Sequence, residues 1–153
     1  MSRSGYSDTL DDWDLIRWRG AVASAIRGKR GQAFLRELLA ALEAMPQQAL
    51  IAEDLEDENG DRCAMGELGH KRGLDLKAID PEDSDAVAKA FGIARCLACE
   101  VAYQNDEQDR WDQDTDGRWR IMPEHCERRW ERMVAWVRAQ IIDRSAGWSE
   151  RGE

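Results

Sequence analysis

Apolar residues recur every three or four positions in three stretches of the chain, which is the spacing of amphipathic α-helices. The first stretch predicts a helix over residues 10–27, and its opening turn is acidic. The second predicts a helix over residues 31–45 that Pro46 terminates. The third predicts a helix over residues 123–143. Their apolar faces carry Leu15, Trp18, Val22, Ala25 and Ile26; Phe34, Leu35, Leu38, Leu39, Leu42 and Met45; and Trp130, Met133, Val134, Val137 and Ile141.

Shorter helices are predicted in the middle of the chain. Residues 65–72 form a brief amphipathic run that ends before a glycine. Asp80 suits a helix N-cap and Pro81 suits the first helical position, so a helix is expected from there to Phe91. A glycine then separates it from a further helix over about residues 93–103.

One β-hairpin and one long loop complete the pattern. The pair Asn59-Gly60 is typical of a two-residue turn between strands, and it predicts a small hairpin between residues 50–52 and 61–64. Residues 104–117 are polar and acidic and predict a loop. A hairpin of this size is marginal alone, so we expect it to pack on the helices.

These elements predict a mainly α-helical (α+β) domain of five to six helices with a small β-hairpin. A chain of 153 residues suits a single compact domain. We place that domain at residues 10–143. Residues 1–9 are expected to be disordered, and residues 144–153 are expected to form a frayed tail.

Charge is distributed unevenly along the chain. The net charge is −9, and residues 1–48, 49–122 and 123–153 carry +1, −10 and 0. Nucleic-acid binding depends on cations that neutralise phosphates, so direct nucleic-acid binding is not expected. A dense acidic field instead favours a basic surface on a partner protein. The alternative is a solvated acidic surface that only keeps the protein in solution.

The chain shows no targeting segment by these criteria. No apolar run approaches the ~20 residues of a membrane helix, and Met1–Tyr6 lacks the apolar centre of a secretory signal. We therefore expect a soluble cytoplasmic protein without membrane contact. Its four cysteines are then expected to be reduced thiols.

Two acidic segments, residues 53–61 and 106–116, are the candidate partner-binding surface. Trp111 and Trp119 bracket the end of the second segment, and exposed tryptophan is enriched at binding hot spots. The alternative is that these rings cover the core. The candidate residues are Glu53, Asp54, Glu56, Asp57, Glu58, Asp106, Glu107, Asp109, Trp111, Asp112, Asp114, Asp116 and Trp119.

The other tryptophans are predicted to be buried or exposed according to the helical face on which they lie. Trp18 and Trp130 fall on apolar faces and are predicted to be core residues. Trp13 and Trp136 are candidates for exposed or partly exposed positions, together with Trp111 and Trp119.

Two incomplete motifs suggest a metal-stabilised module as an alternative function. Asp112, Asp114 and Asp116 precede a glycine as in the first half of a calcium loop, but Pro123 stands where the twelfth-position glutamate belongs. Cys96 and Cys99 have the spacing of a zinc knuckle, and His125 and Cys126 would complete a Cys₃His site. The competing interpretations are an acidic loop and small buried thiols in a helix. We expect no cofactor in the preferred interpretation.

A helix-turn-helix regulator is a further alternative. Residues 84–103 have the apolar spacing of that motif, with a glycine at the turn. The would-be recognition helix offers Arg95 as its cation, carries Glu100, and is followed by acidic residues. An αα-hairpin with a packing role fits these residues better. We find no nucleophile context around the two histidines and no glycine-rich phosphate loop, so an enzyme is not expected.

Three blocks resemble a family of small uncharacterised proteins encoded by phages and prophages of Gram-negative bacteria. They are Met1–Tyr6, IRWRGAVASAIRGKRGQAFLRELLAALEAMP (Ile16–Pro46) and DPEDSDAVAKAFGIA (Asp80–Ala94). The resemblance covers most of residues 1–107 and the Arg/Trp-rich final helix. It carries no catalytic or binding motif, and the cysteine pair and the aspartate run are not typical of the family.

The resemblance implies an accessory protein that acts on host or phage machinery. Many small phage proteins of this kind occlude a host protein, including CRISPR complexes. We therefore expect non-enzymatic binding to a host or phage protein with a basic surface, as in an inhibitor of the anti-CRISPR kind. The sequence does not indicate the partner's identity, the oligomeric state or the role of the basic region Arg27–Arg36.

Overall fold

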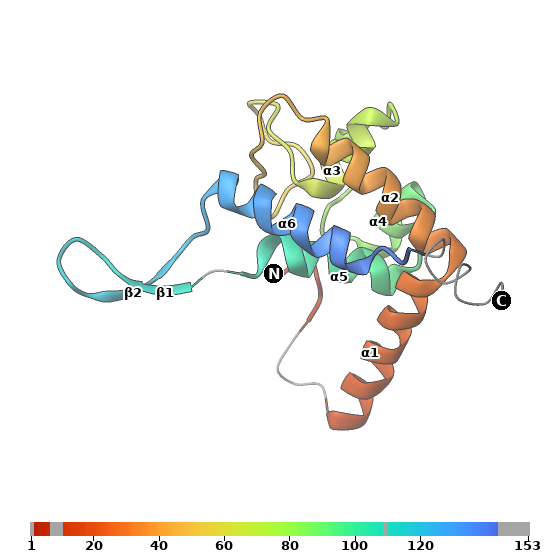
Figure 1. The fold of residues 1–153 in the computed structure, drawn as a ribbon. Coiled ribbons are helices and arrows are strands. Elements are labelled where there is room, and N and C mark those ends of the chain that lie inside the picture. Colours follow the sequence, from red (N-terminus) through yellow and green to blue (C-terminus); the bar gives the residue numbers. More distant parts are fainter. Residues whose placement is uncertain (1, 7–10, 109, 144–153) are drawn as a thin grey trace, which may run out of the picture.

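The structure is a computed structural model that describes residues 2–6, 11–108 and 110–143. The described residues form six α-helices and a two-stranded antiparallel sheet (Figure 1). The predicted class, a mainly α-helical domain with a small β-hairpin, is confirmed. The elements are α1 (Asp12–Arg27), α2 (Lys29–Glu43), α3 (Ala64–Lys71), a 3₁₀ helix (Leu76–Ala78), α4 (Ser84–Phe91), α5 (Arg95–Asp106), β1 (Arg110–Gln113), β2 (Trp119–Met122) and α6 (Cys126–Gln140).

A single residue, Gly28, joins α1 to α2. Asp11 caps α1, because its carboxylate accepts the amide of Asp14 at 2.8 Å. The chain then turns so tightly that a Cβ on Gly31 would lie 1.8 Å from the carbonyl oxygen of Ala25. Glycine is therefore required at this position for α2 to start directly against the end of α1.

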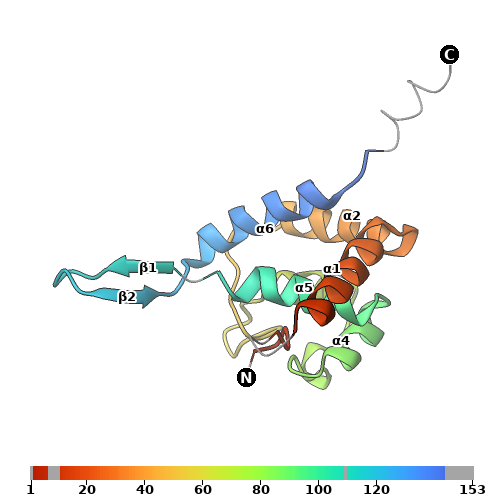
Figure 2. The same cartoon turned by 90° about the horizontal axis from the view of Figure 1, so that it is seen from below.

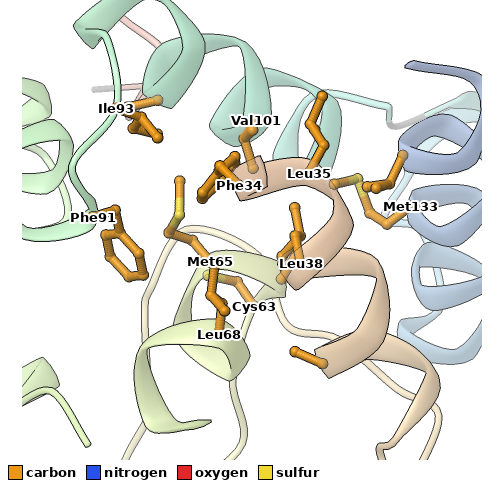
Figure 3. Packing of buried hydrophobic residues seen from close by; sticks show 14 of the residues in the cluster. Phe34, Leu35, Leu38, Cys63, Met65, Leu68, Phe91, Ile93, Val101 and Met133 are labelled. Carbon is orange, nitrogen blue, oxygen red and sulfur yellow. The ribbon is translucent and has the colours of Figure 1, made fainter. Parts of the chain in front are cut away.

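The apolar core is built around α2, which contacts α1, α3 and α6. Leu35 and Leu38 are fully buried, and Figure 3 shows them among Leu68 of α3, Val101 of α5 and Met133 of α6. This arrangement confirms the apolar faces predicted for the second and the last helix. Within the described ranges, no helix has both the length and the apolar character to cross a bilayer.

The hairpin does not lie where the sequence predicted it. Residues 50–63 form an irregular loop in which a single bridge joins Glu56 and Arg62. Asn59-Gly60 does form a turn, with Gly60 at φ 82°, but no ladder continues from it. The loop makes a few scattered backbone bonds of its own, such as Ile51 N–H to the carbonyl of Arg62, and its other buried groups bond to Asn105 of α5 and to Arg129 of α6.

The strand β1 instead lies inside the segment that was predicted to be a loop, and its partner β2 follows two residues after the end of that segment. They pair antiparallel, with Trp111 opposite Ile121 and Gln113 opposite Trp119. Gly117, at φ 79°, makes the turn between them. The prediction of a loop over residues 104–117 is therefore wrong for residues 104–106, which end α5, and for residues 110–113, which form β1. Trp111 is the one apolar residue of this segment, so the strand is specified by its pairing with residues 119–122 and not by an alternating pattern.

Several helix boundaries also differ from the prediction. The helix expected to start at Asp80 begins at Ser84, capped by Asp83, whose carboxylate accepts the amide of Ala86 at 3.1 Å. Asp80 closes a preceding turn instead. The last helix starts at Cys126 rather than at the proline three residues earlier.

The N-terminal segment, defined as residues 2–6, is packed against the domain. Arg3 and Ser4 are buried, so the prediction of disorder is wrong for these residues. The remaining positions of the predicted disordered segment, and the tail expected after residue 143, lie outside the described residues.

A buried polar cluster at the C-terminal end of α5 joins these parts, and we call it the α5 hub (Asn105, Asp106 and Arg129). Asn105 is 1% exposed. Its Oδ1 accepts the amide of Ala64 at 3.1 Å and its Nδ2 donates to the carbonyl of Ile51 at 2.9 Å. The side chain thus joins α5 to the 50–63 loop at Ile51 and to the start of α3 at Ala64.

Arg129 and Asp106 extend the hub to α6 and to the N-terminal segment. Arg129 is buried, and its guanidinium donates to the carbonyls of Asn105 (2.9 Å) and Leu50 (3.0 Å). A cation at the end of α5 also suits the helix dipole. Asp106 forms a two-pronged ion pair with Arg3, at 2.6 and 2.7 Å.

Replacing Asn105 with alanine leaves the Ala64 amide and the Ile51 carbonyl without their partner. We expect Asn105→Ala to lower the free energy of unfolding by roughly 2–4 kcal/mol, measured by urea denaturation. Gln104→Ala is the matched control, because this half-buried neighbour donates only to Glu100; it should cost about 1 kcal/mol or less. Equal losses in both variants would contradict the hub.

Candidate functional site

The β-hairpin forms an arm that extends beyond the helices in both views (Figures 1 and 2). Directly opposed residues of an antiparallel pair, and residues two apart along a strand, point to the same face. The register therefore places Trp111, Trp119 and Ile121 on one face, which we call the arm face. Their exposed fractions are 66%, 65% and 57%. Apolar side chains gathered and exposed in this way mark an interaction surface.

The aspartate run of the arm builds its turn. Asp114 Oδ1 accepts the amides of Asp116 at 2.9 Å and Arg118 at 3.0 Å. Asp114 also forms a 2.6 Å ion pair with Arg120. Asp112 accepts the amide of Gln113 at 2.9 Å. The predicted half of a calcium loop is therefore a hairpin turn, and its carboxylates do not converge on one point.

The predicted zinc ligands are also not brought together. Cys96 and Cys99 lie on α5, whereas His125 and Cys126 are exposed at the start of α6. Burial raises the pKa of the Cys99 thiol, which disfavours the thiolate that zinc binds. Across the part of the chain that the structure describes, no three His, Cys, Asp or Glu side chains are arranged to hold a metal ion. The metal-stabilised alternative therefore has no assembled site there.

The helix-turn-helix alternative fails on the position of its second helix. α5 contacts α1, α3, α4 and α6, and half of its residues are buried. Its cation Arg95 donates to Ser84 at 2.9 Å and lies 5.9 Å from the ring of Trp18. A helix enclosed in this way cannot enter a DNA groove. The interpretation of α4 and α5 as a packed αα-hairpin is supported.

An open hollow of about 510 Å³ lies at the base of the arm. It joins the two acidic segments, because Glu53 of the first lines it together with Asp106 and Glu107 of the second. Trp111 and Ile121 form its arm side, and Ser2 and Arg3 complete the lining. Glu53 and Glu107 are exposed, so the hollow presents carboxylates beside an aromatic ring, and Glu107 does so while its Oε2 accepts the hydroxyls of Ser2 and Ser4.

Some of the predicted binding carboxylates are used inside the molecule. The Asp106 side chain is 7% exposed and paired with Arg3. Glu56 pairs with Arg62 at 2.6 Å, and Asp57 accepts two amides of its own turn. With Asp114, these residues serve the fold and are left out of the candidate site. Asp54 and Glu58 are exposed on the 50–63 loop, Asp116 is exposed at the tip of the arm, and Asp109 lies outside the described residues.

The N-terminal segment is the part of the site that sequence reasoning missed. The hydroxyls of Ser2 and Ser4 donate to Glu107 at 2.8 and 2.5 Å. The Tyr6 hydroxyl donates to Glu100 at 2.5 Å. Burial and this carboxylate raise the pKa of Tyr6 above its ordinary value, so the phenol remains a donor. The sequence did contain one indication of this role. Ser-Arg-Ser-Gly-Tyr is a run of side chains that donate hydrogen bonds, in a chain rich in carboxylates that accept them.

The other tryptophans follow the prediction in part. Trp13 is 71% exposed, as expected. Trp136 is half-buried against the core. Trp130 also packs on the core and donates its Nε1 hydrogen to the carbonyl of Leu42 at 2.9 Å. Trp18 is half-buried and stacks edge-on to Tyr6. The exposed tryptophans of the described residues are thus Trp13, Trp111 and Trp119.

Comparisons of the chain with protein-family models, with curated proteins and with solved structures find no match. The candidate functional site is therefore defined by geometry. It consists of the arm face and of the hollow with Glu53 and Glu107 at the base of the arm.

Arg3 is expected to act as a cover for a buried thiol as well as a partner for Asp106. Its Nη1 lies 3.5 Å from Cys63 Sγ. In the native protein we expect the exposed Cys126 to react first with a thiol reagent, and the buried Cys63 to react slowly. Arg3→Ala should speed labelling of Cys63 by about tenfold or more, because the local opening becomes easier; site-resolved mass spectrometry measures this.

Arg19→Ala serves as the control for that experiment. Arg19 pairs with Glu100 and is half-exposed, and it does not cover Cys63. Unchanged labelling of Cys63 in Arg3→Ala, or equal acceleration in Arg19→Ala, would contradict the covering role of Arg3.

Proposed function

We propose that this chain is a phage or prophage accessory protein that acts in the host cytoplasm by non-enzymatic binding to a host or phage protein with a basic surface. The observation that carries the proposal is the arm face, where two tryptophans and an isoleucine are exposed together on one side of a projecting hairpin. Side chains of this kind dominate the energetics of protein interfaces once they are buried.

The hollow adds recognition of a cation to this apolar anchor. A lysine or arginine from the partner would lie between the carboxylates of Glu53 and Glu107 and the ring of Trp111. An ammonium or guanidinium group gains both charge pairing and attraction to the face of the ring in such a place. The net charge of −9 would speed the encounter with a basic partner.

The chain would act as an inhibitor if the partner's basic surface normally binds nucleic acid. A protein that holds nucleic acid exposes cations in a groove, and an acidic competitor with an aromatic anchor occludes that groove without chemistry. This mechanism fits the resemblance to phage-encoded proteins and an anti-CRISPR type of role. The burial of α5 and the separation of the metal candidates favour neither alternative function.

Loss of the arm face should abolish capture of the partner. We expect Trp111→Ala and Trp119→Ala each to weaken partner binding about tenfold or more, measured by quantitative pull-down from host lysate and then by titration of the purified partner. Trp13→Ala is the matched control, since Trp13 is equally exposed but lies on α1. Capture that survives both arm substitutions would contradict the proposal.

Charge at the hollow should set the salt dependence of the same complex. Raising the salt from about 50 mM to about 500 mM should weaken binding, because exposed charges are screened beyond a Debye length. Glu53→Gln with Glu107→Gln should flatten that dependence, whereas Glu82→Gln, on an exposed turn before α4, should not. A salt-independent wild-type complex would show that the electrostatic part is wrong.

A further inference from the structure

The N-terminal segment lines part of the same hollow in which the partner's cation is proposed to bind. Ser2 and Arg3 border this hollow together with Glu53 and Glu107. Figure 2 shows the segment (red) beside the 50–63 loop (yellow). The segment brings a cation and hydroxyl groups to an acidic surface, so it has the chemistry that is expected of the partner itself.

Two carboxylates at the end of α5 hold the segment. Asp106 accepts two hydrogen bonds from the guanidinium of Arg3, at 2.6 and 2.7 Å. Glu107 accepts the hydroxyls of Ser2 and Ser4, at 2.8 and 2.5 Å. Arginine forms a two-pronged bond of this kind with a carboxylate, whereas lysine cannot. The end of α5 is therefore built as an arginine site, and the chain fills it with its own Arg3.

The α5 hub does not depend on this occupant. The carboxylate of Asp106 also accepts the backbone amide of Glu53 at 3.0 Å and the side-chain amide of Asn105 at 2.7 Å. Both bonds are available when the guanidinium leaves, and Asn105 still bonds to the carbonyl of Ile51. Departure of Arg3 therefore breaks an ion pair but leaves the hub and the 50–63 loop attached to each other.

Departure of the segment would also enlarge the binding site. Arg3 lines both the hollow and a small internal cavity of about 20 Å³. Leu55 and Met65 are among the apolar residues that border this cavity. Without the segment, the cavity would open toward the hollow, and the carboxylate of Asp106 would become accessible. Apolar side chains beneath carboxylates suit an arginine, because its hydrocarbon stem can be buried while its charged end is paired.

We propose that the N-terminal segment is an autoinhibitory contact, and that an arginine of the partner displaces Arg3 from Asp106. This inference rests on the proposed function, whose binding site the segment regulates. The observation that carries it is that a cation of this chain occupies the acidic side of that site in two-pronged geometry. Because the segment belongs to the same chain, it competes at an effective concentration in the millimolar range. The partner then binds with an affinity that is reduced by the fraction of molecules in which the segment is detached.

A peptide with the sequence of the segment tests this competition without any partner. The probe is Ser-Arg-Ser-Gly-Tyr with blocked ends, titrated into the full chain and followed through the NMR signals of the Glu53 and Glu107 amides. A triple-alanine variant of the full chain (Ser2→Ala, Arg3→Ala and Ser4→Ala together) should bind the probe with a Kd on the order of 1 mM. The wild type should bind the probe at least about fivefold more weakly, because its own segment fills the site.

Two controls separate an arginine site from general attraction of charge. A probe with lysine in place of arginine should bind the triple-alanine variant more weakly, and equal binding would overturn the assignment to arginine. Arg72→Ala removes a two-pronged pair with Glu37, neither of which lines the hollow, so it should bind the probe as weakly as the wild type does. Equal binding by the wild type and the triple-alanine variant, or no binding by that variant, would overturn the inference.

The partner complex distinguishes autoinhibition from a merely structural role by the sign of the effect. Arg3→Ala, and the milder pair Ser2→Ala with Ser4→Ala, remove internal contacts, yet each should strengthen binding of the purified partner by about threefold or more. Partner binding that is unchanged or weaker in these variants would contradict autoinhibition. If neither the wild type nor the variants capture a partner, the proposed function fails, whereas the peptide titration still decides whether the segment fills an arginine site.

Discussion

Hydrogen bonding at the C-terminal end of α5 is the constraint on which the rest of the structure depends. The 50–63 loop contains one bridge and few backbone bonds of its own, so several of its buried backbone groups need partners elsewhere. Asn105 supplies a donor and an acceptor to that loop, and Arg129 supplies a donor to Leu50. Without these bonds, buried amides and carbonyls would be left unsatisfied, which is costly in a protein interior.

The same constraint connects the fold to the candidate site. β1 begins four residues after Asp106, the last residue of α5, and α6 follows soon after β2. The base of the arm is thus held from one side by the end of α5 and from the other by Arg129 of α6. The ion pair between Arg3 and Asp106 forms part of the lining of the hollow, and it buries the carboxylate of Asp106. The negative charge of the site therefore comes from those carboxylates that are not buried in ion pairs or in turns of the fold.

The helices could be predicted because burial repeats with their period. Leu35, Leu38 and Met133 lie where the apolar spacing placed them. The hairpin could not be placed correctly from the sequence. Asn59-Gly60 specifies a turn, but apolar and polar residues do not alternate on either side of it. The strands that contain Trp111 and Trp119 follow a strongly acidic segment, which is more typical of a loop than of a strand. A turn signal therefore locates a reversal of the chain and does not locate the strands.

The hub and the internal ion pairs could not be predicted from the pattern at all. Asn105 and Arg129 have no neighbours in sequence that distinguish them from solvated polar residues, and burial of a polar group depends on partners distant along the chain. For the same reason the acidic segments were overestimated as a surface. Trp111 and Trp119 were named as candidates for exposed positions, because neither fell on a helical apolar face, and the structure favours this over the alternative that they cover the core.

Native-state hydrogen exchange measures the central claim most directly, namely that the hub makes the irregular loop part of the cooperative core. The account predicts that the loop amides of Leu50 and Ile51, and the amide of Ala64 at the start of α3, open with nearly the same free energy as the amides of α2 around Leu38. If the loop amides exchange through a local opening several kcal/mol easier than that of α2, then the hub does not hold the loop, and the account of the fold and of the arm's base is wrong.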